Sequence, residues 1–251
     1  MFSQLFSFIP LVILAVLPSL IWLFFYLKED LHPEPRLWLF IVFLMGVALA
    51  PIVIFVEMAI GKALNFWAII PFESGIILMF VIAPLVEEAA KYGAVHLSLN
   101  KNPVLDEPDD CMIYVIVAAL GFAAIENVFA IFSFISIGAP GYLSDAFNFM
   151  SMRFISAVAL HGLASGIAGY YFARFYFVKR NPLLIVWGLF LASLLHGVYN
   201  FLLFKDDQYM SLILTAGVLI AAAAIVMFLF NRLKYHTTYQ QAAVDNVEKQ
   251  K

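Results

Sequence analysis

Long runs of hydrophobic residues dominate the chain, and short polar or proline-containing breaks separate them. A transmembrane helix needs about 20 mostly apolar residues. Seven stretches meet this requirement, approximately Leu5–Leu27, Leu37–Glu57, Gly75–Leu99, Met112–Ile137, Met152–Phe177, Leu183–Phe204 and Met210–Phe230. The short segments of alternating polarity that build membrane β-barrels are absent from the sequence. The pattern therefore predicts an all-α protein, a polytopic transmembrane helix bundle with about seven membrane helices.

The remaining segments are shorter or more polar than a membrane span. Gly61–Phe72 is too short to cross a bilayer and contains Pro71, so we predict an interfacial turn or short helix there. Glu57 stands at the end of the second stretch and is expected to face water. We predict a single membrane-embedded domain over residues 1–232, followed by a polar, loosely structured cytoplasmic tail over residues 233–251.

Composition supports the membrane assignment and excludes some partners. The chain is 64% hydrophobic and only 12% charged, whereas a soluble domain has about 25% charged residues. Most of its surface is therefore expected to face the lipid bilayer. The small net charge of −3 argues against a nucleic acid partner, and the single cysteine, Cys111, excludes an intrachain disulfide.

The distribution of Lys and Arg predicts the orientation in the membrane, because cytoplasmic connections carry an excess of these residues. If the first, third and fifth connections and the C-terminus share one side, that side holds Lys28, Arg36, Lys101, Arg174, Lys179, Arg180, Arg232, Lys234, Lys249 and Lys251, and the other holds Lys62, Arg153 and Lys205. We therefore predict the N-terminus outside and the C-terminus in the cytoplasm. The acidic run from Asp106 to Asp110 is then expected to be a solvated cytoplasmic loop.

Ionisable residues inside membrane spans are costly and indicate a functional site. The third stretch contains Glu87, Glu88 and Lys91, and the next three contain Glu126, His161, and His196 with Asn200. At a rise of ~1.5 Å per residue from the outer end of each stretch, Glu87, Glu126, His161 and His196 lie at depths of ~18, ~17, ~14 and ~12 Å. Four consecutive helices therefore each bring an acid or an imidazole to one layer, which predicts a single active site in the outer half of the membrane.

Two hydrolytic mechanisms fit these residue types. In the first, His161, His196 and a carboxylate such as Glu126 bind Zn²⁺ with one position left for water, and a glutamate, Glu87 or Glu88, takes the proton from that water. In the second, a glutamate and a histidine activate the water without a metal. The sequence leaves both mechanisms open.

The neighbouring residues support either mechanism. Lys91 is four residues after Glu87 and three after Glu88, so it can neutralise one carboxylate on its own helix. Asn200 lies one turn after His196 and can orient the ring or donate a hydrogen bond to a developing oxyanion. We interpret Asn127 as a structural residue.

The order of these motifs resembles the PrsW family of intramembrane proteases, a relative of the CAAX prenyl protease and Abi group. The resemblance rests on Glu87-Glu88-x-x-Lys91, Phe122-x-x-x-Glu126, a lone His161, and His196-x-x-x-Asn200, and the proline-rich loop from Lys28 to Arg36 is also similar. It implies that residues 1–232 form a protease domain in the cell membrane and that Phe122 supports the site.

The resemblance also implies a substrate class. A PrsW-type protease would cut a membrane-anchored protein or peptide, such as an anti-sigma factor, on the extracytoplasmic side. The family is described both as metalloproteases and as glutamate-dependent proteases, so the resemblance leaves the mechanism open.

Two other classes of function fit part of the pattern. Buried Glu, His and Lys also build proton relays in ion-coupled transporters, although the chain lacks the paired inverted repeats with broken helices of many such proteins. A family member without activity could instead act as a binding or immunity protein. Substrate-dependent ion flux would indicate the transporter, and partner binding that survives loss of Glu87 and Glu88 would indicate the inactive relative.

Overall fold

The computed structural model describes residues 2–30, 32–66 and 75–248, and the side chains within residues 8–30, 32–64 and 75–234. The elements, in chain order, are α1 (Phe2–Tyr26), α2 (Arg36–Phe66), the π-helix η1 (Leu78–Ile82), α4 (Ala83–Leu99), α5 (Pro108–Phe134), α6 (Tyr142–Arg153), the π-helix η2 (Phe154–Val158), α7 (Ala159–Ala173), the π-helix η3 (Arg174–Val178), α8 (Leu183–Leu203) and α9 (Gln208–Glu248). Within these residues there is no strand. The predicted all-α class is therefore confirmed.

Six helical segments of the described chain are long and apolar enough to cross a membrane. They are Phe8–Tyr26, Arg36–Leu64, Pro108–Phe134, Tyr142–Val178, Leu183–Leu203 and Gln208–Lys234. The seventh predicted stretch, Gly75–Leu99, is also helical, with three charged residues in its sequence, Glu87, Glu88 and Lys91. The structure therefore agrees with a multi-pass membrane protein.

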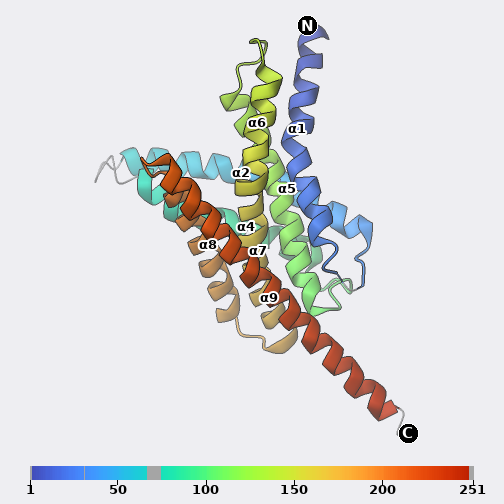
Figure 1. The fold of residues 1–251 in the computed structure, drawn as a ribbon. Helices are drawn as coiled ribbons and strands as arrows, with labels where there is room; N and C mark the ends of the chain where they lie inside the picture. The colour runs from blue at the N-terminus through green and yellow to red at the C-terminus, as the bar shows by residue number, and fades with distance from the viewer. Residues whose placement is uncertain (1, 31, 67–74, 249–251) are drawn as a thin grey trace.

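Helix α5 is the core of the bundle and contacts α1, α2, α4, α7 and α9 (Figure 1). Every residue from Asp109 to Ala124 is buried. A helix that is apolar on all sides is expected to be surrounded by other helices. The sequence of α5 meets this condition over its central turns, from Cys111 to Ile125.

Two glycines allow α2 to pack directly against α5. A Cβ atom at Gly46 would lie 2.0 Å from the carbonyl oxygen of Ala118, and one at Gly121 would lie 2.1 Å from that of Phe43. No side chain larger than hydrogen fits at these distances. Small residues let membrane helices approach closely, so these two positions determine the spacing that brings α2 beside the central helix.

The structure corrects the prediction for the end of the second span. Helix α2 continues to Phe66, so residues 61–66 belong to a long helix, and residues 67–72 lie outside the described residues. The only helix-weakening residue between Glu57 and Pro71 is Gly61, and one glycine costs only about 1 kcal/mol in a helix. Glu57 is consequently half-buried instead of facing water, and its Oε1 atom is buried without a hydrogen-bond partner among the described residues.

The polar tail is also more regular than predicted. Helix α9 runs without a break from Gln208 to Glu248, obliquely across the bundle and beyond it (Figure 1). No glycine or proline follows Gly217, so nothing in the sequence stops the helix where the hydrophobic run ends. The expectation of a loosely structured tail from residue 233 is therefore wrong for the backbone up to Glu248.

In the acidic run from Asp106 to Asp110 only Asp106 is exposed, and Asp109 and Asp110 belong to α5. Asp109 is completely buried and Asp110 is 1% exposed. Asp110 Oδ2 accepts hydrogen bonds from the backbone amides of Asp106 (3.0 Å) and Glu107 (2.7 Å) at the start of α5. The sequence prediction failed here because Glu107 and Asp110 form a capping box at the start of α5, which places Asp109 and Asp110 against the bundle.

The connection between α1 and α2 packs against the same end of α5. Glu34 is buried, and Tyr114 donates a hydrogen bond of 2.5 Å to its Oε2 atom. Burial raises the pKa of the Glu34 carboxyl above its ordinary value, although the hydrogen bond from Tyr114 opposes this rise. The loop is therefore fixed to the core helix by a polar contact.

Candidate active site

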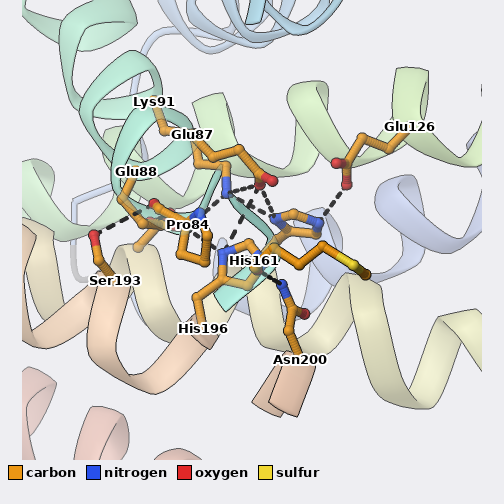
Figure 2. Close-up of polar contacts among 11 residues, drawn as sticks. Pro84, Glu87, Glu88, Lys91, Glu126, His161, Ser193, His196 and Asn200 are labelled. Atoms are coloured by element: carbon orange, nitrogen blue, oxygen red, sulfur yellow. Dashed lines mark hydrogen bonds and ion pairs between the residues drawn. The ribbon is translucent and has the colours of Figure 1, made fainter. Parts of the chain in front are cut away.

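The polar residues singled out in the sequence meet inside the bundle. Helix α4 contributes Glu87, Glu88 and Lys91, α5 contributes Glu126, α7 contributes His161 and α8 contributes His196 (Figure 2). The centroids of the two imidazole rings lie 5.2 Å apart. Apart from Glu126, all of these residues are buried. The structure thus brings the predicted residues of four helices into one cluster.

Two π-helices directly precede the helices that carry this cluster. η1 is followed by α4, with Glu87 in its second turn, and η2 is followed by α7, with His161 near its start. A π-helical turn contains an extra residue, which changes the face that the following residues present, and such turns occur frequently at functional sites. We infer that the two π-helices set the directions of Glu87 and His161.

Lys91 connects the two acids of its own helix to α7. Its Nζ atom donates hydrogen bonds to Glu88 Oε1 (2.6 Å) and Glu87 Oε2 (3.3 Å), and it lies 2.7 Å from His161 Nδ1. It is also 4.9 Å from the centroid of the Phe122 ring. The predicted counter-ion on the same helix is therefore present, and Phe122 lies beside it.

Glu88 is held by partners from three helices. Besides Lys91, its Oε1 atom lies 3.2 Å from His196 Nδ1, and its Oε2 atom accepts a hydrogen bond of 2.7 Å from Ser165 on α7. The residue is only 1% exposed. Because both carboxylate oxygens are engaged, this geometry suits a residue that positions Lys91 and His196.

Ser165 is the residue of the cluster that sequence reasoning missed. It follows His161 by four residues and lies on the same face of α7, where residues one turn apart are neighbours. Its spacing from His161 could have identified it. A serine in an apolar helix is nevertheless common, and its partner Glu88 is 77 residues away in the sequence.

Glu87 lies between the two histidines. Its Oε2 atom is 3.9 Å from His161 Nδ1 and 3.8 Å from His196 Nδ1. Glu87, His161 and His196 each offer a ligand atom, and these atoms all lie within 4.8 Å of one another. Ligands of a tetrahedral Zn²⁺ at 2.0–2.2 Å would be about 3.3–3.5 Å apart. The two distances to Glu87 Oε2 exceed this spacing by about half an ångström. The three residues therefore fit a metal ion once the group closes around it, with Lys91 giving up its contact to His161 Nδ1.

Glu126 contacts the other ring nitrogen of His161. Its Oε2 atom is 2.5 Å from His161 Nε2, on the side of the ring away from Lys91 (Figure 2). Its side chain is 22% exposed, against 8% for Glu87. The sequence predicted that Glu126 and the two histidines would bind the metal. The structure instead brings Glu87 together with His161 and His196. Helix α4, and not α5, faces the gap between α7 and α8.

The Asn200 amide forms its hydrogen bond with the backbone of η1 and not with the His196 ring. Its Nδ2 atom donates a hydrogen bond of 3.2 Å to the carbonyl oxygen of Met79, in η1. Gly197, on the same helix, would place a Cβ atom 2.1 Å from the carbonyl oxygen of Phe80. Helix α8 therefore packs directly on the π-helix, and in this arrangement the Asn200 amide ties the two together.

Asn127 has the structural role expected for it. Its Nδ2 atom donates to the carbonyl oxygen of Ala15 at 3.0 Å, and its Oδ1 atom accepts from Arg153 Nε at 2.6 Å. These bonds join α1, α5 and the end of α6 next to Glu126.

The comparison with protein families identifies the architecture around this cluster. Residues 34–230 match the sequence model described as the PrsW family of intramembrane metalloproteases. The chain belongs to this family. The match includes the motifs from Glu87 to Asn200 and confirms the resemblance seen in the sequence.

Several relatives of this PrsW family member carry the name Protease PrsW. The protein of Clostridioides difficile is 31% identical over 217 residues, covering 84% of this chain and 87% of the relative. That of Geobacillus kaustophilus is 29% identical over 202 residues (77% and 80%), and that of Bacillus subtilis is 26% identical over 182 residues (72% and 76%). No solved structure matches the chain.

Family membership determines the class of activity. The chain is a multi-pass intramembrane protease whose substrate is a protein in the membrane. This family membership favours a protease over the ion-coupled transporter that the sequence left as an alternative. The buried group of Glu87, His161 and His196 is the place where a metalloprotease of this family could hold its metal.

Proposed function

We propose that this PrsW family member hydrolyses a peptide bond of a membrane-anchored protein at a zinc site formed by Glu87, His161 and His196. The observation that carries the proposal is the meeting of these three buried residues, from three helices, with ligand atoms within 4.8 Å of one another. Two imidazoles and a carboxylate are a donor set that suits catalytic zinc. Bound zinc would polarise the scissile carbonyl and make a water molecule more acidic.

The other residues of the cluster have separate roles in this proposal. Glu126 has the most exposed carboxylate of the three in the cluster and takes the proton from the attacking water. Glu88 holds His196, and Lys91 balances the charge of the two adjacent glutamates. Ser165 fixes Glu88 through its hydroxyl group. Asn200, which contacts Met79, keeps α8 against η1 and is not assigned to the oxyanion.

Metal content is the direct test of this site. Detergent-purified wild-type protein should contain one zinc per chain by mass spectrometry, and the His161→Ala/His196→Ala variant should contain none, because both nitrogen ligands are lost. His96→Ala is the matched control, since His96 is exposed on α4 outside the cluster, and it should keep the metal. Wild-type protein that cleaves peptide bonds without any metal would contradict the zinc site. It would then assign the water-activating role to the carboxylates and imidazoles alone.

We also propose that the substrate is a membrane-anchored anti-sigma factor cut on its extracytoplasmic side. The support is the family resemblance together with the predicted orientation, which places the cluster in the outer half of the membrane. Co-expression with a tagged anti-sigma factor of the same organism should yield a shortened fragment, and Glu87→Gln should leave the substrate intact. If the anti-sigma factor stays intact while another membrane-anchored protein is cut, the substrate proposal is wrong and the protease assignment stands.

A further inference from the structure

A second cluster of acidic side chains lies away from the active site, where the α1–α2 connection meets the start of α5. Its members are Glu34, Asp106, Glu107, Asp109 and Asp110. Asp109 and Glu126 are 17 residues apart on the same helix, which corresponds to ~26 Å along its axis. The cluster is therefore separate from the proposed zinc site.

The carboxylate of Asp109 is buried without a hydrogen-bond partner among the described residues. Its side chain is completely buried, and neither Oδ1 nor Oδ2 has a hydrogen-bond partner among the described residues. The Oε2 atom of Glu107 is buried and unpartnered in the same way. Burial of an ionised carboxylate is costly unless it is paired or coordinates a metal. Asp109 thus points to a ligand.

The cations nearby are engaged with other atoms. His32 Nδ1 lies 2.7 Å from Glu107 Oε1, so this contact leaves the buried Oε2 atom of Glu107 without a partner among the described residues. Lys234, whose charge also acts on Asp109, forms a salt bridge of 2.9 Å with Glu29. Neither contact includes an oxygen of Asp109.

Carboxylate oxygens of three members of the cluster lie close enough to share one ion. Glu107, Asp109 and Asp110 each offer a carboxylate oxygen, and these oxygens lie within 4.8 Å of one another. Two oxygens bound to the same Ca²⁺ at 2.3–2.6 Å can be up to about 4.6–5.2 Å apart. Glu34 and Asp106 form a second such group with Asp110, so further oxygen ligands lie beside the first three.

We propose that Glu107, Asp109 and Asp110 bind a divalent cation that prefers oxygen ligands, Ca²⁺ or Mg²⁺, which stabilises the start of the core helix α5. A set made only of carboxylates suits these hard cations and differs from the two imidazoles and one carboxylate of the zinc site. Glu34 offers an oxygen beside Asp110 and also contacts Tyr114 of α5, so the ion helps to secure the α1–α2 connection to the core. The chemical class of the ligand is therefore distinct from that of the catalytic metal.

Thermal unfolding of the full-length protein tests the proposal. The His161→Ala/His196→Ala background removes the proposed zinc site, so that only the acidic cluster responds to added metal. EDTA should lower the unfolding temperature, and CaCl2 or MgCl2, added separately, should restore it, because a ligand that binds only the folded state stabilises it. The cation that restores the unfolding temperature at the lower concentration is the one that the site binds more tightly.

Asp109→Asn distinguishes a specific site from general effects of salt. This variant should bind the cation at least ~10-fold more weakly and lose the temperature response. In EDTA it should be more stable than its parent, because a buried unpaired charge has been removed. Asp206→Asn, at an exposed aspartate in another loop, should respond as the parent does. Glu107→Gln repeats the test if Asp109→Asn does not fold.

Three results would overturn the proposal. The first is an unfolding temperature that neither Ca²⁺ nor Mg²⁺ changes, which would show that protons alone neutralise the cluster. The second is cation binding that Asp109→Asn and Glu107→Gln leave intact, which would locate the ion elsewhere. The third is a loss of the cation-dependent rise in unfolding temperature that is as large in Asp206→Asn as in Asp109→Asn.

Discussion

His196→Ala should abolish peptide cleavage while the protein stays folded and inserted in the membrane. His196 lies 3.8 Å from the Glu87 carboxylate and 3.2 Å from Glu88, so its loss removes a metal ligand and a contact of the anchoring glutamate. Loss of residues that merely support a metal ligand typically costs 10–100-fold in activity. Loss of the ligand itself should therefore reduce activity by more than ~100-fold, measured as the rate of fragment formation in proteoliposomes.

His96→Ala is the control for this experiment, because it removes an imidazole from the same bundle without touching the cluster. It should cleave at the wild-type rate. Wild-type activity in His196→Ala with an unchanged unfolding temperature would remove His196 from the active site. If His196→Ala is inactive, the size-exclusion profile of the purified variant distinguishes a folded protein that lacks activity from a protein that has lost its fold.

Lys91→Met should be strongly destabilising. The Lys91 side chain is completely buried and forms ion pairs of 2.6 Å with Glu88 and 3.3 Å with Glu87. Removal of one partner of a buried pair leaves an uncompensated charge and costs about 3–5 kcal/mol. Methionine keeps most of the side-chain volume, so the loss reports on charge. Denaturant unfolding in detergent, or the unfolding temperature, measures the effect.

The double variant Lys91→Met/Glu88→Gln tests this interpretation. If charge is the cause, neutralising Glu88 should recover part of the lost stability, and the two single changes should not be additive. Additive losses would show that Lys91 acts through its packing against Phe122. Cleavage should stay low in the double variant, because His196 still lacks the charged partner that Glu88 supplies.

These two experiments examine one connected network. Lys91 contacts both glutamates of α4 and His161, while Glu88 contacts His196 and Ser165. Buried polar networks of this kind hold their members rigidly when every member is satisfied. We infer that the same contacts that stabilise the packing of α4, α7 and α8 also position the catalytic side chains.

Much of the fold and of the site was predictable from sequence. Hydrophobic runs indicate membrane helices because each span must satisfy its own backbone hydrogen bonds and expose apolar side chains to lipid. Acids and imidazoles in such runs are costly, so the sequence predicts that Glu87, Glu126, His161 and His196 form one layer. The motif order also pointed to the PrsW family.

The ends of the helices were less predictable. Hydropathy marks where the apolar character ends, whereas a helix ends where its backbone is interrupted. Helix α2 therefore continues past Glu57, and α9 continues past Asn231. In the same way, the acidic residues 106–110 read as a solvated loop, although Asp109 and Asp110 are buried at the start of α5.

The sequence by itself determined the membrane helices, the family and the set of residues in the active layer, because these follow from residue type and spacing along one helix. Only the tertiary structure decided how the residues of this set pair. It placed Glu87, and not Glu126, between the histidines, directed Asn200 to Met79 and joined Ser165 to Glu88. These pairings depend on the rotation and crossing of helices that are far apart in sequence. The π-helices and the close approach at Gly197 fix that rotation, and residue spacing along a single helix contains no information about it.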